Sequence, residues 1–324
     1  MSNIIDLVIH PEIKLSVDLI RESIAKSEGI LNDNIHASLL KILELRADAQ
    51  SANGARLCIF SMPKSASSFV QSTLQSAFQL PFVSLATTSS NSSAIGANPR
   101  EQELDELAII MHNIANGSYI AQHHTRASPY TCTLLRNYGI IPVICIRNIP
   151  DCMVSILDMS EQWLFSATDE VLPGMIWSNS GGSWPFAWRQ LTRSEKLNIV
   201  IDRWAKWYLD FFISWKRAAM TEQASPLFVV YENDILNGSK GFVEKAVKFF
   251  KLNLIQKDAF EASVVNFDKG KARFNKGISG RGAEQLSTNQ NSKILHIAKP
   301  YLSELSDDEC LLLFSASKND IRAV

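Results

Sequence analysis

Residues 63–69 (PKSASSF) combine groups that bind anions with residues that form turns, and they follow a short apolar run. Where a strand turns into a helix, the first backbone N–H groups have no intrahelical acceptor and the helix dipole is positive. Lys64 adds a positive charge, and Ser65, Ser67 and Ser68 add hydroxyl donors. This set suits a phosphate or a similar anion, although the GxxxxGKS/T pattern of a Walker A loop is absent. A surface turn with serine caps is the alternative interpretation.

A second candidate anion site follows the apolar run 141–146, in the segment 147–155 (RNIPDCMVS). Arg147 stands directly after the run, and a guanidinium group can bond two phosphate oxygens at once. Asp151 fits the first turn of a following helix, and Ser155 lies further along it with a hydroxyl to donate. The alternative is an ordinary helix N-terminus preceded by a surface arginine.

A third candidate is the loop 273–282 (RFNKGISGRG), in which Arg273, Lys276 and Arg281 alternate with three glycines. Glycine permits backbone conformations in which N–H groups approach an anion closely. The segment is therefore a candidate anion-binding loop, and the alternative is a basic loop without fixed structure.

Two adjacent histidines, His123 and His124, close the apolar run 118–123. An imidazole can take a proton from a hydroxyl group near neutral pH, so a histidine at a strand end is a candidate general base. The alternative is that both histidines pack at the end of the strand.

Taken in order, these segments resemble the motifs of the sulfotransferases that use 3′-phosphoadenosine-5′-phosphosulfate (PAPS). In that family a PKSGTTW-like loop holds the 5′-phosphosulfate, an R-N-P-x-D-x-x-x-S stretch holds the 3′-phosphate, and a late R-K-G-x-x-G loop closes on the same phosphate. Arg147 and Ser155 match the spacing of the second motif, and residues 275–280 (NKGISG) are similar to the third. Residues 230–233 (VYEN) are similar to a family strand that ends in YED, and the resemblance covers roughly residues 55–290.

The resemblance implies an enzyme that moves a sulfuryl group from PAPS to a hydroxyl or amine of a small molecule and releases adenosine 3′,5′-bisphosphate. The base would be His124, with His123 as the second choice, and Lys64 would stabilise the leaving oxygen. No metal is implied, and the sequence has no ligand cluster of metal type. The residues implied in nucleotide binding are Lys64, Ser65, Ala66, Ser67, Ser68, Phe69, Arg147, Ser155, Tyr231, Arg273, Lys276, Gly277 and Arg281.

Three departures from the family pattern bear on this interpretation. Ala66 stands where the family has its first loop glycine, which costs on the order of 1 kcal/mol if that position needs a positive φ. Asn275 replaces the arginine of R-K-G, so Arg273 or Arg281 would supply the missing cation. The proline of R-N-P comes one place late, at Pro150.

The acceptor stays open among lipids, phenols, polyketide-type alcohols and carbohydrates. Two other functions are alternatives: a P-loop phosphotransferase or kinase, and a nucleotide-binding protein without enzymatic activity. A kinase would be expected to carry the Walker A glycines and an acidic metal ligand after a strand. The departures at Ala66 and Asn275 are what favours a binding protein.

Four short apolar runs alternate with stretches of helical periodicity, and the candidate residues stand at the ends of these runs. We expect parallel strands, which places the candidate residues together at the carboxyl edge of one sheet. The predicted fold is a P-loop-like three-layer α/β fold with a central, mostly parallel sheet flanked by helices. The strands are expected at 56–61, 118–123, 141–146 and 227–231.

The organisation of the chain is expected to be simple, because no repeat and no linker divides it. Residues 1–324 are predicted to form a single sulfotransferase-like domain, and residues 1–50 have helical periodicity. The segment at about 160–192 is rich in tryptophan, glycine and proline. It is predicted to be an insert, either a lid over a substrate pocket or additional core.

Composition excludes several classes of partner. Lys+Arg 32 nearly balances Asp+Glu 33, so no overall charge draws the chain to nucleic acid or to an anionic membrane. No run approaches the ~20 apolar residues that span a bilayer, and the five cysteines have no CxxC spacing. We therefore expect a cytoplasmic protein with reduced thiols and no stable membrane insertion. The family's dimerisation motif is not preserved in residues 283–292, which leaves the oligomeric state open.

Overall fold

The computed structural model describes residues 22, 25–26, 33–86, 103–165, 167–174, 176, 184–236, 238–267 and 278–324. Within these residues five strands form one sheet in the order β2-β3-β1-β4-β5, and every neighbouring pair is parallel. The strands are β1 (Arg56–Ser61), β2 (Phe82–Val83), β3 (Tyr119–His123), β4 (Ile140–Ile146) and β5 (Leu227–Val230). This confirms the expected α/β fold with a parallel central sheet.

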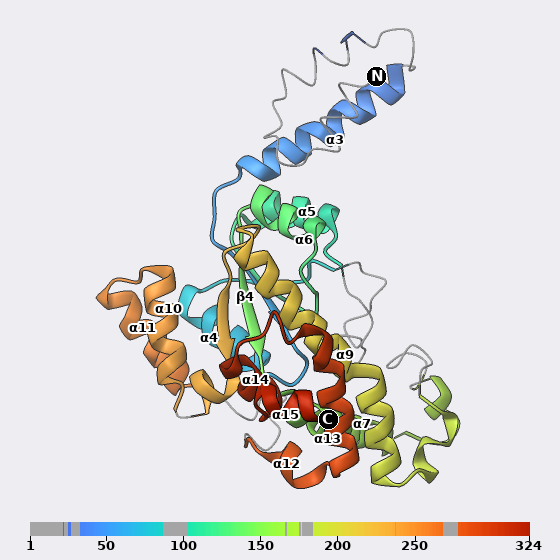
Figure 1. Ribbon diagram of the computed structural model, residues 1–324. Coiled ribbons are helices and arrows are strands. Elements are labelled where there is room, and N and C mark those ends of the chain that lie inside the picture. The colour runs from blue at the N-terminus through green and yellow to red at the C-terminus, as the bar shows by residue number, and fades with distance from the viewer. Residues whose placement is uncertain are drawn as a thin grey trace.

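Helices cover both faces of the sheet and make the molecule three layers deep (Figure 1). All six residues of β1 are buried. The four residues 57–60 in its middle form the uninterrupted apolar run that a strand covered on both faces needs. Leu57 and Ile59 join an apolar cluster with residues of α4, α10 and α11. Cys58 and Phe60 point the other way, into a larger cluster with α7 and α9. The alternation along β1 thus builds both cores.

The helices around the sheet begin at polar capping residues in most cases. Capping boxes open α9, α11, α13, α14 and α15, where a side-chain oxygen accepts from a backbone N–H three residues later. The helices are α3 (Asp33–Ser51), α4 (Ser67–Phe78), α5 (Glu106–Asn116), α6 (Pro129–Asn137), α7 (Ile149–Phe165), α9 (Arg193–Met220), α10 (Lys240–Phe250), α11 (Leu254–Val265), α12 (Arg281–Gln285), α13 (Thr288–Ala298), α14 (Asp307–Phe314) and α15 (Lys318–Ala323). Shorter turns are η2 (Phe186–Gln190), η3 (Tyr231–Ile235) and η4 (Lys299–Tyr301).

The expected helical segment 1–50 is seen in part as α3, which projects from the body at the top of Figure 1. Most of residues 1–32 lie outside the described part of the chain. None of the helices in the described part has the length and apolar content needed to cross a bilayer.

A buried arginine organises the edge of the sheet at which the strands begin. The guanidinium group of Arg56 donates to the backbone oxygens of Gly117 (2.8 Å), Tyr138 (2.9 Å) and Ala52. These residues follow the last turns of α5, α6 and α3. Helix C-termini carry partial negative charge, so three helix ends balance the positive charge.

Two tryptophans in the described part of the tryptophan-rich insert belong to the core. Trp184 and Trp188 stack face to face, with ring centroids 4.4 Å apart and planes 7° from parallel. Both are buried in the cluster that includes α7 and α9. Trp177 and the side chain of Trp163 lie outside the described residues. These two stacked rings therefore act as packing between the insert and α9.

Candidate functional site

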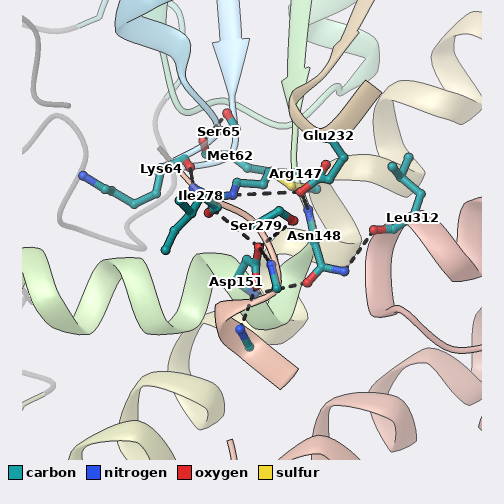
Figure 2. A network of polar contacts seen from close by, with 12 residues as sticks. Met62, Lys64, Ser65, Arg147, Asn148, Asp151, Glu232, Ile278, Ser279 and Leu312 are labelled. Carbon is teal, nitrogen blue, oxygen red and sulfur yellow. Dashed lines mark hydrogen bonds and ion pairs between the residues drawn. The ribbon is translucent and has the colours of Figure 1, made fainter. Parts of the chain in front are cut away.

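The carboxyl edge of the sheet brings the candidate segments together, because all strands run in the same direction. β1 leads into the turn at 62–66, β3 ends at His123, β4 leads to Arg147 and β5 leads to Tyr231. Figure 2 shows Lys64 and Arg147 within one network of polar contacts. The two segments expected to bind the two ends of a nucleotide therefore lie next to each other.

The turn after β1 has an unusual backbone. Lys64 has φ 70° and Ala66 has φ 64°, both in the left-handed region. A residue with a Cβ pays roughly 1–2 kcal/mol for that conformation, so the structure shows the positive φ at Ala66 that would favour glycine there. Ser65 stabilises the turn because its hydroxyl donates to the Met62 carbonyl at 2.6 Å. Such strain is kept where surrounding contacts impose it, often at functional sites.

Helix α4 begins directly after this turn, so the first N–H groups of the helix lie at the turn. Ser67 and Ser68 are its first two residues, so their amides have no acceptor within the helix. Gln122 of β3 donates to the Ser67 hydroxyl at 2.9 Å, which leaves the hydroxyl proton able to donate in turn. The Lys64 ammonium lies 3.7 Å from the Met159 sulfur of α7. The turn thus presents donors of the kind that bind an anion.

Arg147 joins three separate turns. Its Nη1 donates to the Lys64 carbonyl (3.0 Å) and its Nη2 to the Ile278 carbonyl (2.8 Å). The guanidinium lies 4.1 Å above the Tyr231 ring, and its Nε is 3.9 Å from Oε1 of Glu232. Among the described residues the Nε–H group has no hydrogen-bond acceptor. Arg147 is buried, so its charge is held in a low-dielectric environment close to the Lys64 turn.

Asp151, at the start of α7, anchors the late loop. Its Oδ1 accepts from the Gly282 N–H at 2.7 Å, and its Oδ2 accepts from the Gly280 N–H and the Ser279 hydroxyl, both at 3.0 Å. Gly282 is required for this approach, because a Cβ there would lie 2.4 Å from the Cβ of Pro150. Pro150 at this position therefore requires a glycine at position 282. Sequence reasoning treated Asp151 only as a first-turn residue and missed this contact.

Arg281, expected at the nucleotide, is occupied by an ion pair. Its side chain is 4% exposed and bonds the Asp158 carboxylate of α7. Asp158 also accepts from Arg193 at 2.8 Å. Burial raises the pKa of Asp158, but the hydrogen bonds from the two arginines outweigh it and leave that pKa below its ordinary value. Three further residues expected in this loop lie outside the described part of the chain: Arg273, Lys276 and Gly277.

The two histidines differ in which ring nitrogen is engaged. Nε2 of His123 accepts from the Leu85 N–H at 2.9 Å, and burial together with His124 lowers the pKa of His123 to about 3. Nδ1 of His124 lies 2.7 Å from the Ser61 carbonyl oxygen. Only a protonated Nδ1 can bond a carbonyl, so the lone pair of His124 is on Nε2. The two histidines thus differ: Nε2 of His123 accepts from a backbone N–H, and Nε2 of His124 carries the lone pair of that ring.

Helix α9 supports both the Lys64 turn and the segment after β3. The Tyr208 hydroxyl donates to the Pro63 carbonyl at 2.7 Å, and Nε1 of Trp215 donates to the Thr125 carbonyl at 3.1 Å. Sequence reasoning missed both residues. The only signal for them was the apolar periodicity of a 28-residue helix, which does not reveal which aromatic side chain reaches which loop.

Helix α14 also reaches the site, through Asn148. The Asn148 side chain donates to the Leu312 carbonyl (3.1 Å) and the Ser315 hydroxyl (3.0 Å), and it accepts from the Asp151 N–H (3.2 Å). The Asn148 N–H donates to Glu232 at 3.1 Å. Burial raises the pKa of Glu232 despite this bond. The residue after Arg147 is thus fixed by a segment far along the chain.

The remaining expected residues line the same edge. Phe69 is half-buried and meets Phe267 edge to face, with centroids 4.8 Å apart. Ser155 is buried in α7, two turns beyond Arg147, and Tyr231 is buried under the Arg147 guanidinium. Among the residues that the structure describes, no group of three or more His, Cys, Asp or Glu side chains is placed to hold a metal.

Comparison with known proteins finds similarity among solved structures. No protein-family model matches the chain, and no curated protein matches it. Among solved structures, the chain is similar to the crystal structure of mouse sulfotransferase SULT7A1 complexed with PAP. The identity is 14%, the TM-score is 0.49, and the match covers 83% of this chain and 92% of that chain.

Proposed function

We propose that this protein transfers a sulfuryl group from PAPS to a hydroxyl or amine of a small molecule. The observation that supports this most is the contact between Nη1 of Arg147 and the Lys64 carbonyl, 3.0 Å long. It places a buried guanidinium beside a turn of anion donors at one sheet edge. PAPS carries anionic groups at both its 5′ and its 3′ position, so it needs two such sites close together.

The 5′-phosphosulfate lies on the turn after β1 in this proposal. The first N–H groups of α4 and the hydroxyls of Ser67 and Ser68 bond its oxygens. The Ser65 hydroxyl, which the sequence also suggested as a donor, already donates to the Met62 carbonyl. The Lys64 ammonium neutralises the bridging oxygen as its bond to sulfur breaks. Because these groups are already ordered in the turn, little reorganisation accompanies the reaction.

The 3′-phosphate lies near Arg147 and Ser155, and the segment with Arg273, Lys276 and Gly277 closes on it. Arg281 is held by Asp158, so Arg273 is the better candidate for the missing cation of this loop. The adenine ring packs on Phe69, and Phe267 is the neighbouring aromatic surface.

His124 is the proposed general base. Its Nε2 takes the proton of the acceptor hydroxyl, whose oxygen attacks sulfur in line with the bond to the bridging oxygen. The new O–S bond forms as the old one breaks, and the electron pair leaves with adenosine 3′,5′-bisphosphate. The Ser61 carbonyl keeps the proton of His124 on Nδ1, which holds Nε2 ready to accept.

Two measurements test the proposal. Thermal shift with adenosine 3′,5′-bisphosphate and with ATP–Mg²⁺ compares a sulfotransferase with a kinase, and stabilisation by ATP–Mg²⁺ alone contradicts the proposal. Radiolabelled PAPS offered with phenol, carbohydrate, lipid and polyketide-type acceptors measures turnover. Binding without turnover of any acceptor would indicate a nucleotide-binding protein instead.

Substitution of the base gives a sharper test. His124→Asn should lower turnover by about 10²–10⁴-fold, while affinity for adenosine 3′,5′-bisphosphate, measured by calorimetry, stays within a few-fold. The matched control is His296→Asn, because His296 is exposed on α13. Full turnover in His124→Asn would remove His124 from the mechanism.

A further inference from the structure

The carbonyl groups on both sides of Lys64 are held by side chains from other elements. The Pro63 carbonyl accepts from the Tyr208 hydroxyl at 2.7 Å, and the Lys64 carbonyl accepts from Nη1 of Arg147 at 3.0 Å. A carbonyl direction defines the plane of its peptide group. The two bonds therefore fix both peptide planes that flank the Lys64 Cα atom.

Fixing these planes matters because Lys64 has φ 70°, a conformation that a lysine does not adopt readily. If the peptide planes were free to rotate, the residue would relax to negative φ. The Lys64 side chain would then leave in another direction. The observed geometry therefore depends on contacts from outside the turn.

The bond to the Pro63 carbonyl is the one hydrogen bond of the Tyr208 hydroxyl among the described residues. Its ring is 0% exposed, and it lies on the buried face of α9 against Trp207. About two turns further along α9, Trp215 donates to the carbonyl of Thr125, the residue directly after His124. The same helix thus holds the turn with the cation and the segment with the base.

We propose that Tyr208 is a positioning residue, which sets the direction of Lys64 through the Pro63 carbonyl without touching the nucleotide. This inference rests on the proposed function for its effect on turnover. The effect of Tyr208 on the conformation of the turn does not depend on which ligand binds.

The test compares two buried tyrosines that each lose one hydroxyl. Tyr208→Phe removes the bond to Pro63, and Tyr119→Phe removes a bond of 2.8 Å to Asn113. Tyr119 is also 0% exposed, but it begins β3 at the opposite edge of the sheet. Because phenylalanine keeps the ring in both cases, both variants should fold and lose a similar amount of thermal stability.

We expect Tyr208→Phe alone to lower the kcat for PAPS turnover at least tenfold, about 1.4 kcal/mol in the barrier, with a smaller change in the KM for PAPS. Because Tyr208 acts through Lys64, adding Tyr208→Phe to Lys64→Met should lower turnover no further. Equal losses of turnover in Tyr208→Phe and Tyr119→Phe would overturn the inference, as would a further loss in the double variant.

Amide hydrogen exchange separates this inference from the proposed function. Exchange in residues 63–69 should be faster in Tyr208→Phe than in Tyr119→Phe, whatever the ligand. If the unaltered protein turns over no PAPS but this difference is present, the proposed function fails and the role of Tyr208 stands. If exchange in 63–69 is the same in both variants, the role of Tyr208 is refuted.

Discussion

The Asp151 carboxylate holds residues 279–282 against the start of α7. Its two oxygens accept three hydrogen bonds from residues 279–282. Asp151→Asn keeps the size of the side chain but replaces one oxygen by an NH₂ group, which cannot accept. Oδ2 serves two donors and also lies 3.5 Å from Nη2 of Arg147, whereas Oδ1 serves only Gly282. We therefore expect the amide oxygen to stay at Oδ2 and the NH₂ group to face the Gly282 N–H.

The magnitude follows from that geometry. The variant loses a charge-assisted bond of 2.7 Å, a kind of bond worth about 1.5–3 kcal/mol. It also places two donors opposite each other, the new NH₂ group and the Gly282 N–H. A loss of about 2 kcal/mol in loop docking corresponds to roughly 30-fold in the affinity of a ligand that needs the docked loop.

Calorimetry with adenosine 3′,5′-bisphosphate measures this effect. The matched control is Asp202→Asn on α9, because Asp202 is exposed and pairs only with the surface residue Lys293. The control should bind the nucleotide as the unaltered protein does. If Asp151→Asn binds within threefold of the unaltered protein, while hydrogen exchange at 279–282 shows a loosened loop, the docked loop has no part in nucleotide binding.

Three further predictions concern stability. Ala66→Gly should raise the free energy of unfolding by about 1 kcal/mol, because it removes left-handed strain at φ 64°; a lower value in urea denaturation contradicts this. The pKa of His123 is about 3 when folded and about 6.5 when unfolded, so the unfolded state binds more protons below pH 6.5. Stability should therefore fall as pH drops from about 6.5 towards 3, by up to about 1.4 kcal/mol per unit, and an equally steep fall in His123→Gln would rule this out. Arg56→Met should lower the free energy of unfolding by about 3 kcal/mol or more, because it removes three hydrogen bonds from a charged group to carbonyl groups at helix ends. Arg203→Met, at an exposed position on α9, should change it little, and equal losses would contradict the role assigned to Arg56.

The sheet was predictable because its strands are buried on both faces. Such strands need continuous apolar runs, and these stand out in the sequence. The predicted strand 56–61 coincides with β1, and the other three differ from β3, β4 and β5 by one residue at an end. β2 escaped prediction because Phe82–Val83 is too short for any periodicity to appear.

The place of the site was also predictable. Parallel strands end at one edge, so residues that follow different strands must meet there. This rule alone placed Lys64, His124 and Arg147 together, although the structure was needed to show that Arg147 touches the Lys64 turn directly.

The sequence by itself thus determined the strands and the edge at which the polar groups gather, because these follow from local patterns and strand direction. Only the tertiary structure decided what each polar group bonds. Arg281 is committed to Asp158, the proton of His124 is held on Nδ1 by Ser61, and Tyr208 reaches Pro63. Each partner lies more than sixty residues away along the chain. The identity of such partners depends on how helices pack on the sheet, which no local pattern of residues contains.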